Sequence, residues 1–198
     1  MENFHSKISI IIDEELSKSG NKEFAQRRNR LIGKGVISYG VKTSEIRKIA
    51  KEYWKNNQEL KMMKNCFKIA KELISTKILD NQMAGIFLLG LCQEISAKDI
   101  PRLKKLITLY LDNWATCDAI SSEVMARILR DYPKETGILY SWAQSQNKWL
   151  RRVALVTTIK LKDKTENWGK IASQLLSISA EEKEPIVKKA IRWLRRSL

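Results

Sequence analysis

The stretch NWATCDAI, residues 113–120, is followed by a related stretch, NKWLRRVAL, at residues 147–155. In each stretch a tryptophan stands five positions before an alanine. The alanine recurs at spacings of 35, 35 and 36 residues, inside apolar stretches, at Ala84, Ala119, Ala154 and Ala190. A fixed period of this length is typical of a helical solenoid, in which stacked helix pairs bury a face against their neighbours. The repeat therefore predicts an all-α fold, a curved α-α superhelix of antiparallel helix pairs.

Apolar residues recur with helical spacing along the whole chain, and we expect about eleven helices and no confident strand. The first is predicted over residues 3–18, and the second is expected to end at Gly33, a residue typical of helix C-termini. Thr43 is the predicted N-cap of the third helix. Between them, KGVISYGVKT is expected to be a loop, with a short strand as the alternative. No linker rich in Pro, Gly or Ser is present, so we predict a single domain over residues 1–198.

The charge balance indicates an anionic partner. The chain has 37 Lys and Arg against 22 Asp and Glu, a formal net charge of +15. A surplus of this size favours nucleic acid, and the alternative is a lysine-rich surface with no binding role. The predicted nucleic-acid contacts lie near both ends of the chain and in its middle: Arg27, Arg28, Arg30, Lys34, Arg152, Lys188, Lys189, Arg192 and Arg196.

Residue types exclude several classes of active site. The only histidine is His5, so a Cys-His or Ser-His-Asp triad and the usual zinc sites are excluded. Three cysteines without a CxxC spacing indicate free thiols in a reducing compartment. Any acid or base chemistry then falls to a carboxylate, and we expect no metal and no cofactor. Without a visible signal peptide or membrane-length apolar run, the expected location is cytoplasmic, associated with the nucleoid if the source is prokaryotic.

Tryptophans and one aspartate are the remaining candidates. Trp54, Trp142 and Trp168 lie on amphipathic faces and are expected in the core, and Trp149 is expected in packing between repeats. For Trp114 and Trp193 the sequence allows two roles, packing between repeats or contact with a sugar or base. Asp118 follows a predicted helix start, so it is either an acid stabilised by the helix dipole or a functional carboxylate.

Four short motifs occur in the same order as in a known family: SYGVKTSEIRKIAKEY, WATCD followed by AI, WLRRVAL, and VKKAIRWLRR. Over about residues 25–198 the chain resembles the AlkD family of DNA-alkylation-repair glycosylases. The resemblance implies HEAT-like helix pairs that hold duplex DNA in a basic concavity. It also implies hydrolysis of the N-glycosidic bond of N3- or N7-alkylated purines, without lyase activity, by a monomer that uses no metal.

The resemblance assigns roles to residues of this chain. It implies that Asp118 is the catalytic carboxylate, that Trp114 and Trp193 pack around the deoxyribose, and that Arg152 holds a neighbouring phosphate. Arg196 is implied as a further phosphate contact. Leu31 stands where the family often places an aromatic residue, and the chain ends at Leu198, where relatives usually continue with further helical sequence. Two alternatives to the enzyme stay open, a HEAT-like DNA-binding protein without catalysis and a scaffold for a protein partner.

Overall fold

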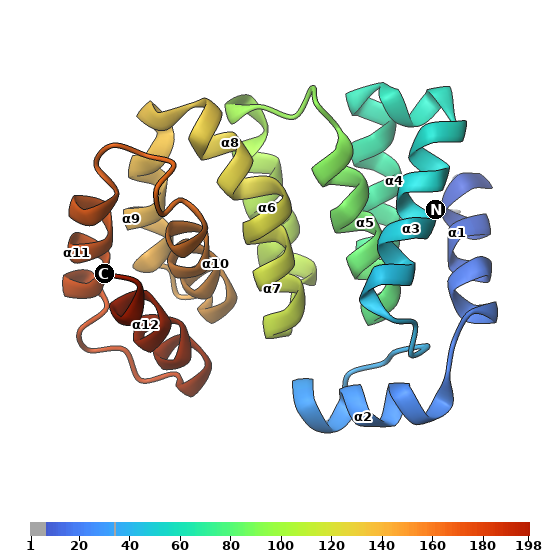
Figure 1. The fold of residues 1–198 in the computed structure, drawn as a ribbon, viewed down its shortest axis with the longest axis horizontal. Coiled ribbons are helices and arrows are strands. Elements are labelled where there is room, and N and C mark those ends of the chain that lie inside the picture. The colour runs from blue at the N-terminus through green and yellow to red at the C-terminus, as the bar shows by residue number, and fades with distance from the viewer. Residues whose placement is uncertain (1–6, 34) are drawn as a thin grey trace. The chain divides into compact units, whose positions relative to one another are not determined.

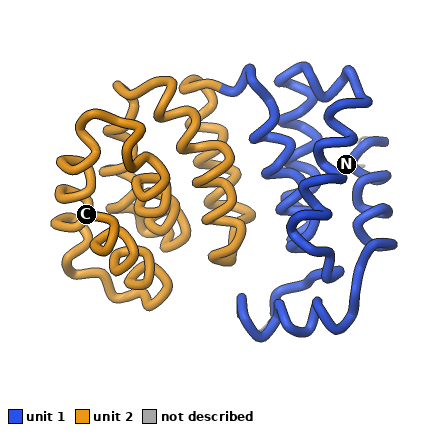
Figure 2. The backbone as a smooth tube through the Cα atoms, viewed as in Figure 1, with its two compact units in different colours: residues 1–95 blue, residues 96–198 orange. Residues whose placement is uncertain are grey.

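A computed structural model describes residues 7–33 and 35–198, and this part of the chain is helical, with no β-strand. It contains eleven helices when the continuous run over residues 114–131 is taken as one. The chain packs as two compact units, residues 1–95 and 96–198 (Figure 2). The all-α prediction is confirmed, and the single domain stays a prediction.

The helices follow the predicted segments closely (Figure 1). Unit 1 contains α1 (Lys7–Lys18), α2 (Lys22–Ile32), α3 (Thr43–Asn56), the short 3-10 helix η1 (Gln58–Lys61), α4 (Met63–Ser75) and α5 (Leu79–Leu91). Unit 2 contains η2 (Ala97–Asp99), α6 (Ile100–Tyr110), α7 (Trp114–Ile120), the π-helical turn η3 (Ser121–Met125), α8 (Ala126–Asp131), η4 (Pro133–Gly137), α9 (Ile138–Ala143), α10 (Lys148–Lys160), α11 (Trp168–Ile178) and α12 (Pro185–Ser197).

Helix α5 is the centre of unit 1. Every residue from 79 to 89 is buried, and α3, α4 and α1 pack against it. Gly85 permits the close approach of α4, since a Cβ at this position would lie 2.7 Å from the carbonyl oxygen of Ala70. The short connection over residues 76–78 makes α4 and α5 an antiparallel pair, as the apolar pattern of the two segments predicts.

Helix α10 is the centre of unit 2. It contacts α6, α7, α9, α11 and α12, and its residues 152–159 are all buried (Figure 1). The buried set includes one charged residue, Arg152, which is 5% exposed. A buried guanidinium is stable only when it is paired, so the helices around α10 have to supply its partners.

Helix ends agree with the sequence predictions except at α3. Gly33 caps α2 with its backbone N–H on the carbonyl of Asn29, as expected. The predicted N-cap Thr43 is instead the first residue of α3, and the cap position is Lys42. The Thr43 hydroxyl is used elsewhere, since it accepts a hydrogen bond of 3.1 Å from Arg28. The first predicted helix begins at Lys7 in the described part of the chain, and residues 3–6 lie outside it.

Asp80 ties the loop before α3 and the polar helix α2 to the core of unit 1. Its carboxylate is fully buried and accepts hydrogen bonds from the Ser38 hydroxyl at 2.7 Å and from the backbone N–H of Tyr39 and Val41 at 2.8 and 2.9 Å. It also accepts from the guanidinium of Arg28 at 2.8 Å. Four donors around one carboxylate compensate for its removal from water.

Arg28 was expected among the nucleic-acid contacts, and the structure gives it another role. It is 9% exposed and forms an ion pair with Asp80, because its side chain points from α2 toward the core. Burial lowers the pKa of the Arg28 guanidinium, and the charge of Asp80 opposes this change. Arg28 therefore has a structural role in unit 1.

We expect Asp80→Ala to destabilise the protein by about 3–5 kcal/mol, because it leaves the charge of Arg28 and two loop N–H groups buried without their acceptor. Urea unfolding at neutral pH measures the change. The matched control is Glu23→Ala, which removes the partner of an exposed arginine on the same helix, Arg27, and should cost about 1 kcal/mol or less. Equal losses in the two variants would contradict the structural role of Asp80.

Candidate active site

The start of α7 places two of the predicted residues on one face. The side chain of Asn113 caps the helix by accepting a hydrogen bond of 3.1 Å from the backbone N–H of Thr116. The cap fixes the first turn, so that Trp114 and Asp118, four positions apart, lie on the same side of the helix. Both side chains are half-buried.

Asp118 and Arg152 form a bidentate ion pair between α7 and α10. The Nε of Arg152 donates to one carboxylate oxygen and Nη2 to the other, each at 2.8 Å. The two side chains are 22% and 6% exposed. This fork geometry is the strongest form of a carboxylate–guanidinium contact, and it fixes the plane of the Asp118 carboxylate. Sequence reasoning named both residues and did not predict that they bind each other.

Arg152 also connects the pair to α12. Its Nη1 donates at 2.7 Å to the carbonyl oxygen of Ile186, in the first turn of that helix. The helix carries Trp193, which with Arg152 borders a hollow of about 400 Å³. Three exposed cationic residues of the same helix complete its lining: Lys189, Arg192 and Arg196. The structure thus brings five of the predicted site residues, with Asp118, into one region of unit 2.

A second arginine holds the loop that leads into α12. Arg151 donates from Nε and Nη2 to the two oxygens of Glu182, at 2.7 and 3.1 Å, and from Nη1 to the carbonyl of Ser145. Glu182 also accepts from the backbone N–H groups of Lys183 and Glu184. Although burial alone would raise the pKa of Glu182, these hydrogen bonds lower it overall. Arg151 is therefore a structural neighbour of the site.

The electrostatics of Asp118 involve a residue that sequence reasoning missed. Burial raises the pKa of Asp118, and the hydrogen bonds and charge of Arg152 and the charge of Lys160 oppose the rise. The Nζ of Lys160 also lies 5.1 Å from the centre of the Trp193 ring. Nothing in the sequence marks Lys160, because it ends a buried helix and meets Trp193 only through the packing of α10 against α12.

The other predicted contacts in the described part of the chain are not among the residues that line this hollow. Lys188 is exposed on α12 and does not line it. Arg27 and Arg30 are exposed on α2 in unit 1. Lys34 lies outside the described residues. Lys188, Arg27 and Arg30 have the exposed positive charge expected of phosphate contacts, and their role stays a prediction.

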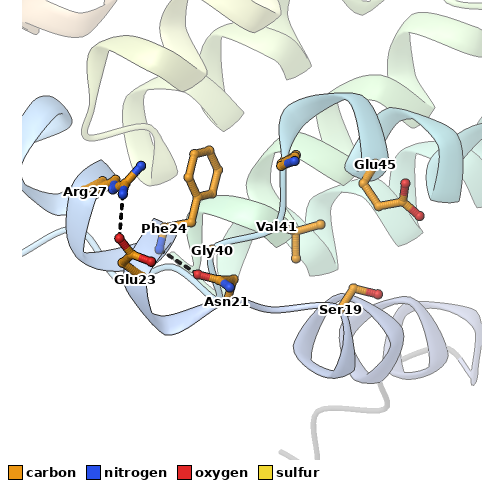
Figure 3. A pocket seen from close by; sticks show the side chains of 9 residues that line it. Ser19, Asn21, Glu23, Phe24, Arg27, Gly40, Val41 and Glu45 are labelled. Carbon is orange, nitrogen blue, oxygen red and sulfur yellow. Dashed lines mark hydrogen bonds and ion pairs between the residues drawn. The ribbon is translucent and has the colours of Figure 1, made fainter.

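Unit 1 has a hollow of its own, of about 350 Å³, between α2 and the start of α3. Figure 3 shows Phe24 and Arg27 on α2 and Glu45 on α3 around it. Its charged residues are two acids and two bases, which favours neither an anion nor a cation: Glu23, Glu45, Arg27 and Lys42. The hollow therefore does not resemble the strongly basic one beside Arg152.

The three cysteines of the chain are buried, and none of them forms a disulfide. The side-chain hydrogen bond with Cys66 lowers the pKa of Cys92 to about 7. Burial raises the pKa of Cys117 well above its ordinary value, and the neighbouring Asp118 charge adds to the rise, so its thiolate is suppressed. Within the described part of the chain, no group of three or more His, Cys, Asp or Glu side chains is placed to hold a metal ion. None of the described helices has the length and apolarity needed to cross a membrane.

Comparison with protein-family models identifies a family that the chain matches. A family model described as "DNA alkylation repair enzyme" matches residues 12–198. The match covers most of unit 1, all of unit 2 and every residue of the site around Asp118 and Arg152. No curated protein matches the chain at a significant level.

We expect Glu182→Gln to lower the free energy of unfolding by about 2 kcal/mol at pH 7, because the charged acceptor of Arg151 is lost. The pKa of Glu182 is lower in the folded protein than its ordinary value of 4.5, so the stabilisation is present above that value and is lost as the pH falls below it. Urea unfolding at pH 7 and pH 4 should therefore show a difference between wild type and variant that shrinks on acidification. Glu184→Gln, at an exposed ion pair with Lys148, is the control and should change stability little at either pH. A pH-independent difference for Glu182→Gln would contradict the assignment.

Proposed function

Because the chain belongs to the family of DNA alkylation repair enzymes, we propose that it is a monofunctional DNA glycosylase acting on alkylated purines in duplex DNA. Membership establishes an enzyme of DNA alkylation repair with DNA as its partner. The proposal adds the reaction, which is hydrolysis of the N-glycosidic bond of N3- or N7-alkylated purines, by a monomer with HEAT-like repeats. No metal or cofactor has a role in it.

The observation that carries the proposal is the Asp118–Arg152 pair beside the basic hollow of α12. A carboxylate held in a fixed plane by an arginine, which itself borders a hollow with an aromatic wall and exposed cations, matches the needs of a reaction at a sugar between two phosphates. A non-catalytic DNA-binding protein needs only the cations. Asp118 is partly buried, and Arg152 offsets the free-energy cost of burying its charge. This arrangement favours the enzyme over the binding protein.

The proposed substrate class is one that needs no strong general acid. Alkylation at N3 or N7 gives the purine a positive charge, so the base leaves as a neutral molecule with the electron pair of the C1′–N bond. The histidine-poor composition suits such a substrate, because no proton has to be delivered to the leaving base. An unmodified purine would need that proton.

Asp118 acts where positive charge develops. Departure of the base leaves an oxocarbenium-like sugar, which a nearby carboxylate stabilises electrostatically. A water molecule then bonds through its oxygen to C1′, and its released proton passes to the carboxylate and on to solvent. The π-faces of Trp114 and Trp193 pack around the deoxyribose and favour the same cationic state. Since no lysine Schiff base forms, borohydride should trap no covalent DNA adduct.

The basic residues hold the backbone of the DNA. Exposed cations that neutralise phosphates position the duplex without reading its sequence. We assign this role to residues of α12 and α2, namely Lys188, Lys189, Arg192, Arg196, Arg27 and Arg30. Arg152 has five N–H donors, of which three are used by Asp118 and Ile186. The remaining two are proposed to meet the phosphate beside the damaged nucleotide.

Release of 7-methylguanine and 3-methyladenine from methylated duplex DNA tests the reaction. We expect wild-type protein to release both bases and Asp118→Asn to be slower by about 10²-fold, because the developing sugar cation loses its charged partner. The control is Asp112→Asn, an exposed aspartate six positions earlier, which should keep the wild-type rate. Fluorescence anisotropy with undamaged duplex should show unchanged binding in all three proteins. Salt-dependent DNA binding without base release by folded wild type would instead support the non-catalytic binder.

The pH dependence of the rate tests the state of Asp118. The residue acts as a carboxylate and its pKa is raised by burial, so the rate at saturating DNA should fall on acidification at a higher pH than an ordinary aspartate would give. Lys160→Met removes a charge that lowers this pKa, so it should move the acid limb of the profile to still higher pH. Lys170→Met, at an exposed position on α11, is the control and should leave the limb unchanged. If Lys160→Met leaves the acid limb unchanged, the charge of Lys160 does not act on the pKa of Asp118.

A further inference from the structure

The helix that carries Asp118 is interrupted directly after it. Helix α7 ends at Ile120, residues Ser121–Met125 form a π-helical turn, and α8 continues from Ala126. In this turn the backbone N–H of Ala126 donates to the carbonyl of Ser121, a bond that spans one residue more than in an α-helix. Such turns are rare in proteins and often lie at functional sites.

The packing of this helix against α10 explains why the turn is there. Buried residues recur at steps of four along two rows: Thr116, Ile120, Val124 and Ile128, and Cys117, Ser121, Met125 and Leu129. In a regular α-helix each step of four residues turns the row by about 40°. Three such steps would carry the ends of the rows off the core. The wider π turn lowers the rotation per residue, so both rows stay buried.

The turn therefore sets the direction of Asp118. Residues before the turn are rotated relative to those after it, and α8 is fixed by its own buried residues Ile128 and Leu129. Without the turn, the face that carries Trp114 and Asp118 would point elsewhere around the helix axis. The bidentate contact with Arg152 tolerates little rotation, because both oxygens lie at 2.8 Å from their donors.

Two serines hold the backbone at this point. The hydroxyl of Ser122 donates at 2.7 Å to the carbonyl oxygen of Asp118 itself. The hydroxyl of Ser121 lies 2.7 Å from the carbonyl oxygen of Cys117 and 3.4 Å from that of Val153, the residue after Arg152. Serine hydroxyls that bond to the carbonyl four residues earlier often bend helices. Here the two serines are the first two residues of the π turn.

We propose that Ser121 and Ser122 are positioning residues, which hold the π turn and thereby set the Asp118 carboxylate against Arg152 for the reaction. The proposal rests on the proposed glycosylase function for its catalytic meaning. Its geometric part, the dependence of the Asp118–Arg152 pair on the two hydroxyls, does not require any activity. Neither serine touches the substrate in this role.

The test compares the double variant S121A/S122A with wild type and with Ser141→Ala. Ser141 makes a similar bond to a backbone carbonyl, that of Ile138, on the exposed side of α9. At saturating methylated DNA, we expect single-turnover base release to fall about tenfold in the double variant, because small displacements of a catalytic group cost rate steeply. DNA affinity should stay within about twofold, and S121T/S122T, which restores both hydroxyls, should recover most of the rate. Ser141→Ala should match wild type throughout.

A carboxyl ¹³C NMR titration of Asp118 gives the second readout and needs no DNA. Since Arg152 lowers the pKa of Asp118, a looser pair in S121A/S122A should raise it, while Ser141→Ala should not. An unchanged Asp118 pKa together with an unchanged rate would overturn the proposal, and so would a rate that falls only through weaker DNA binding. If wild type releases no base, the glycosylase function fails, and the titration still decides whether the serines position Asp118.

Discussion

The burial of a charged arginine in the central helix of unit 2 is the constraint on which the site depends. α10 is enclosed by other helices, so Arg152 is largely removed from water and has to be paired within the protein. The Asp118 carboxylate on α7 and the Ile186 carbonyl on α12 supply the partners. One side chain thereby fixes the two helices that carry the carboxylate and Trp193. The same interaction that stabilises the packing also assembles the candidate site.

Unit 1 contains a second buried arginine–aspartate pair, and the comparison separates structure from chemistry. Asp80 is completely buried, and its oxygens are occupied by four donors, among them Arg28. The Asp118 side chain is 22% exposed. Its hydrogen-bond donor, Arg152, borders an open basic hollow. A carboxylate that is saturated with donors can only hold a loop. A carboxylate that keeps some exposure, and whose partner borders a hollow, can meet a substrate.

Much of this architecture was predictable from the sequence, because a helix in a stacked pair imposes a simple apolar period. The helices and the cap at Gly33 follow from local patterns, and the candidate site residues on α7, α10 and α12 were proposed from the resemblance in motifs. The ion pairs between these side chains could not be predicted from the sequence. In RRNR, nothing distinguishes the exposed Arg27 from the buried Arg28. Successive residues of a helix point in different directions, and the packing of α2 determines which of the two arginines faces the core. The π turn was hidden as well, because steps of four residues look like an ordinary helix face in the sequence.

The distribution of charge resolves an apparent conflict in the proposed chemistry. A formal net charge of +15 attracts the DNA backbone and would repel a cationic purine placed among the same residues. In unit 2 the two demands are met by different groups. Exposed cations on α12 suit phosphates, while the electron-rich elements nearby are the Asp118 carboxylate and the face of Trp193. Arg152 neutralises part of the Asp118 charge, and Lys160 lies beside the Trp193 ring. In the free protein, therefore, both the carboxylate and the electron-rich ring have a cation beside them. The proposed reaction then requires the sugar to be held at Asp118 and its phosphates at α12, and this geometry makes the carboxylate most effective when the sugar becomes positive.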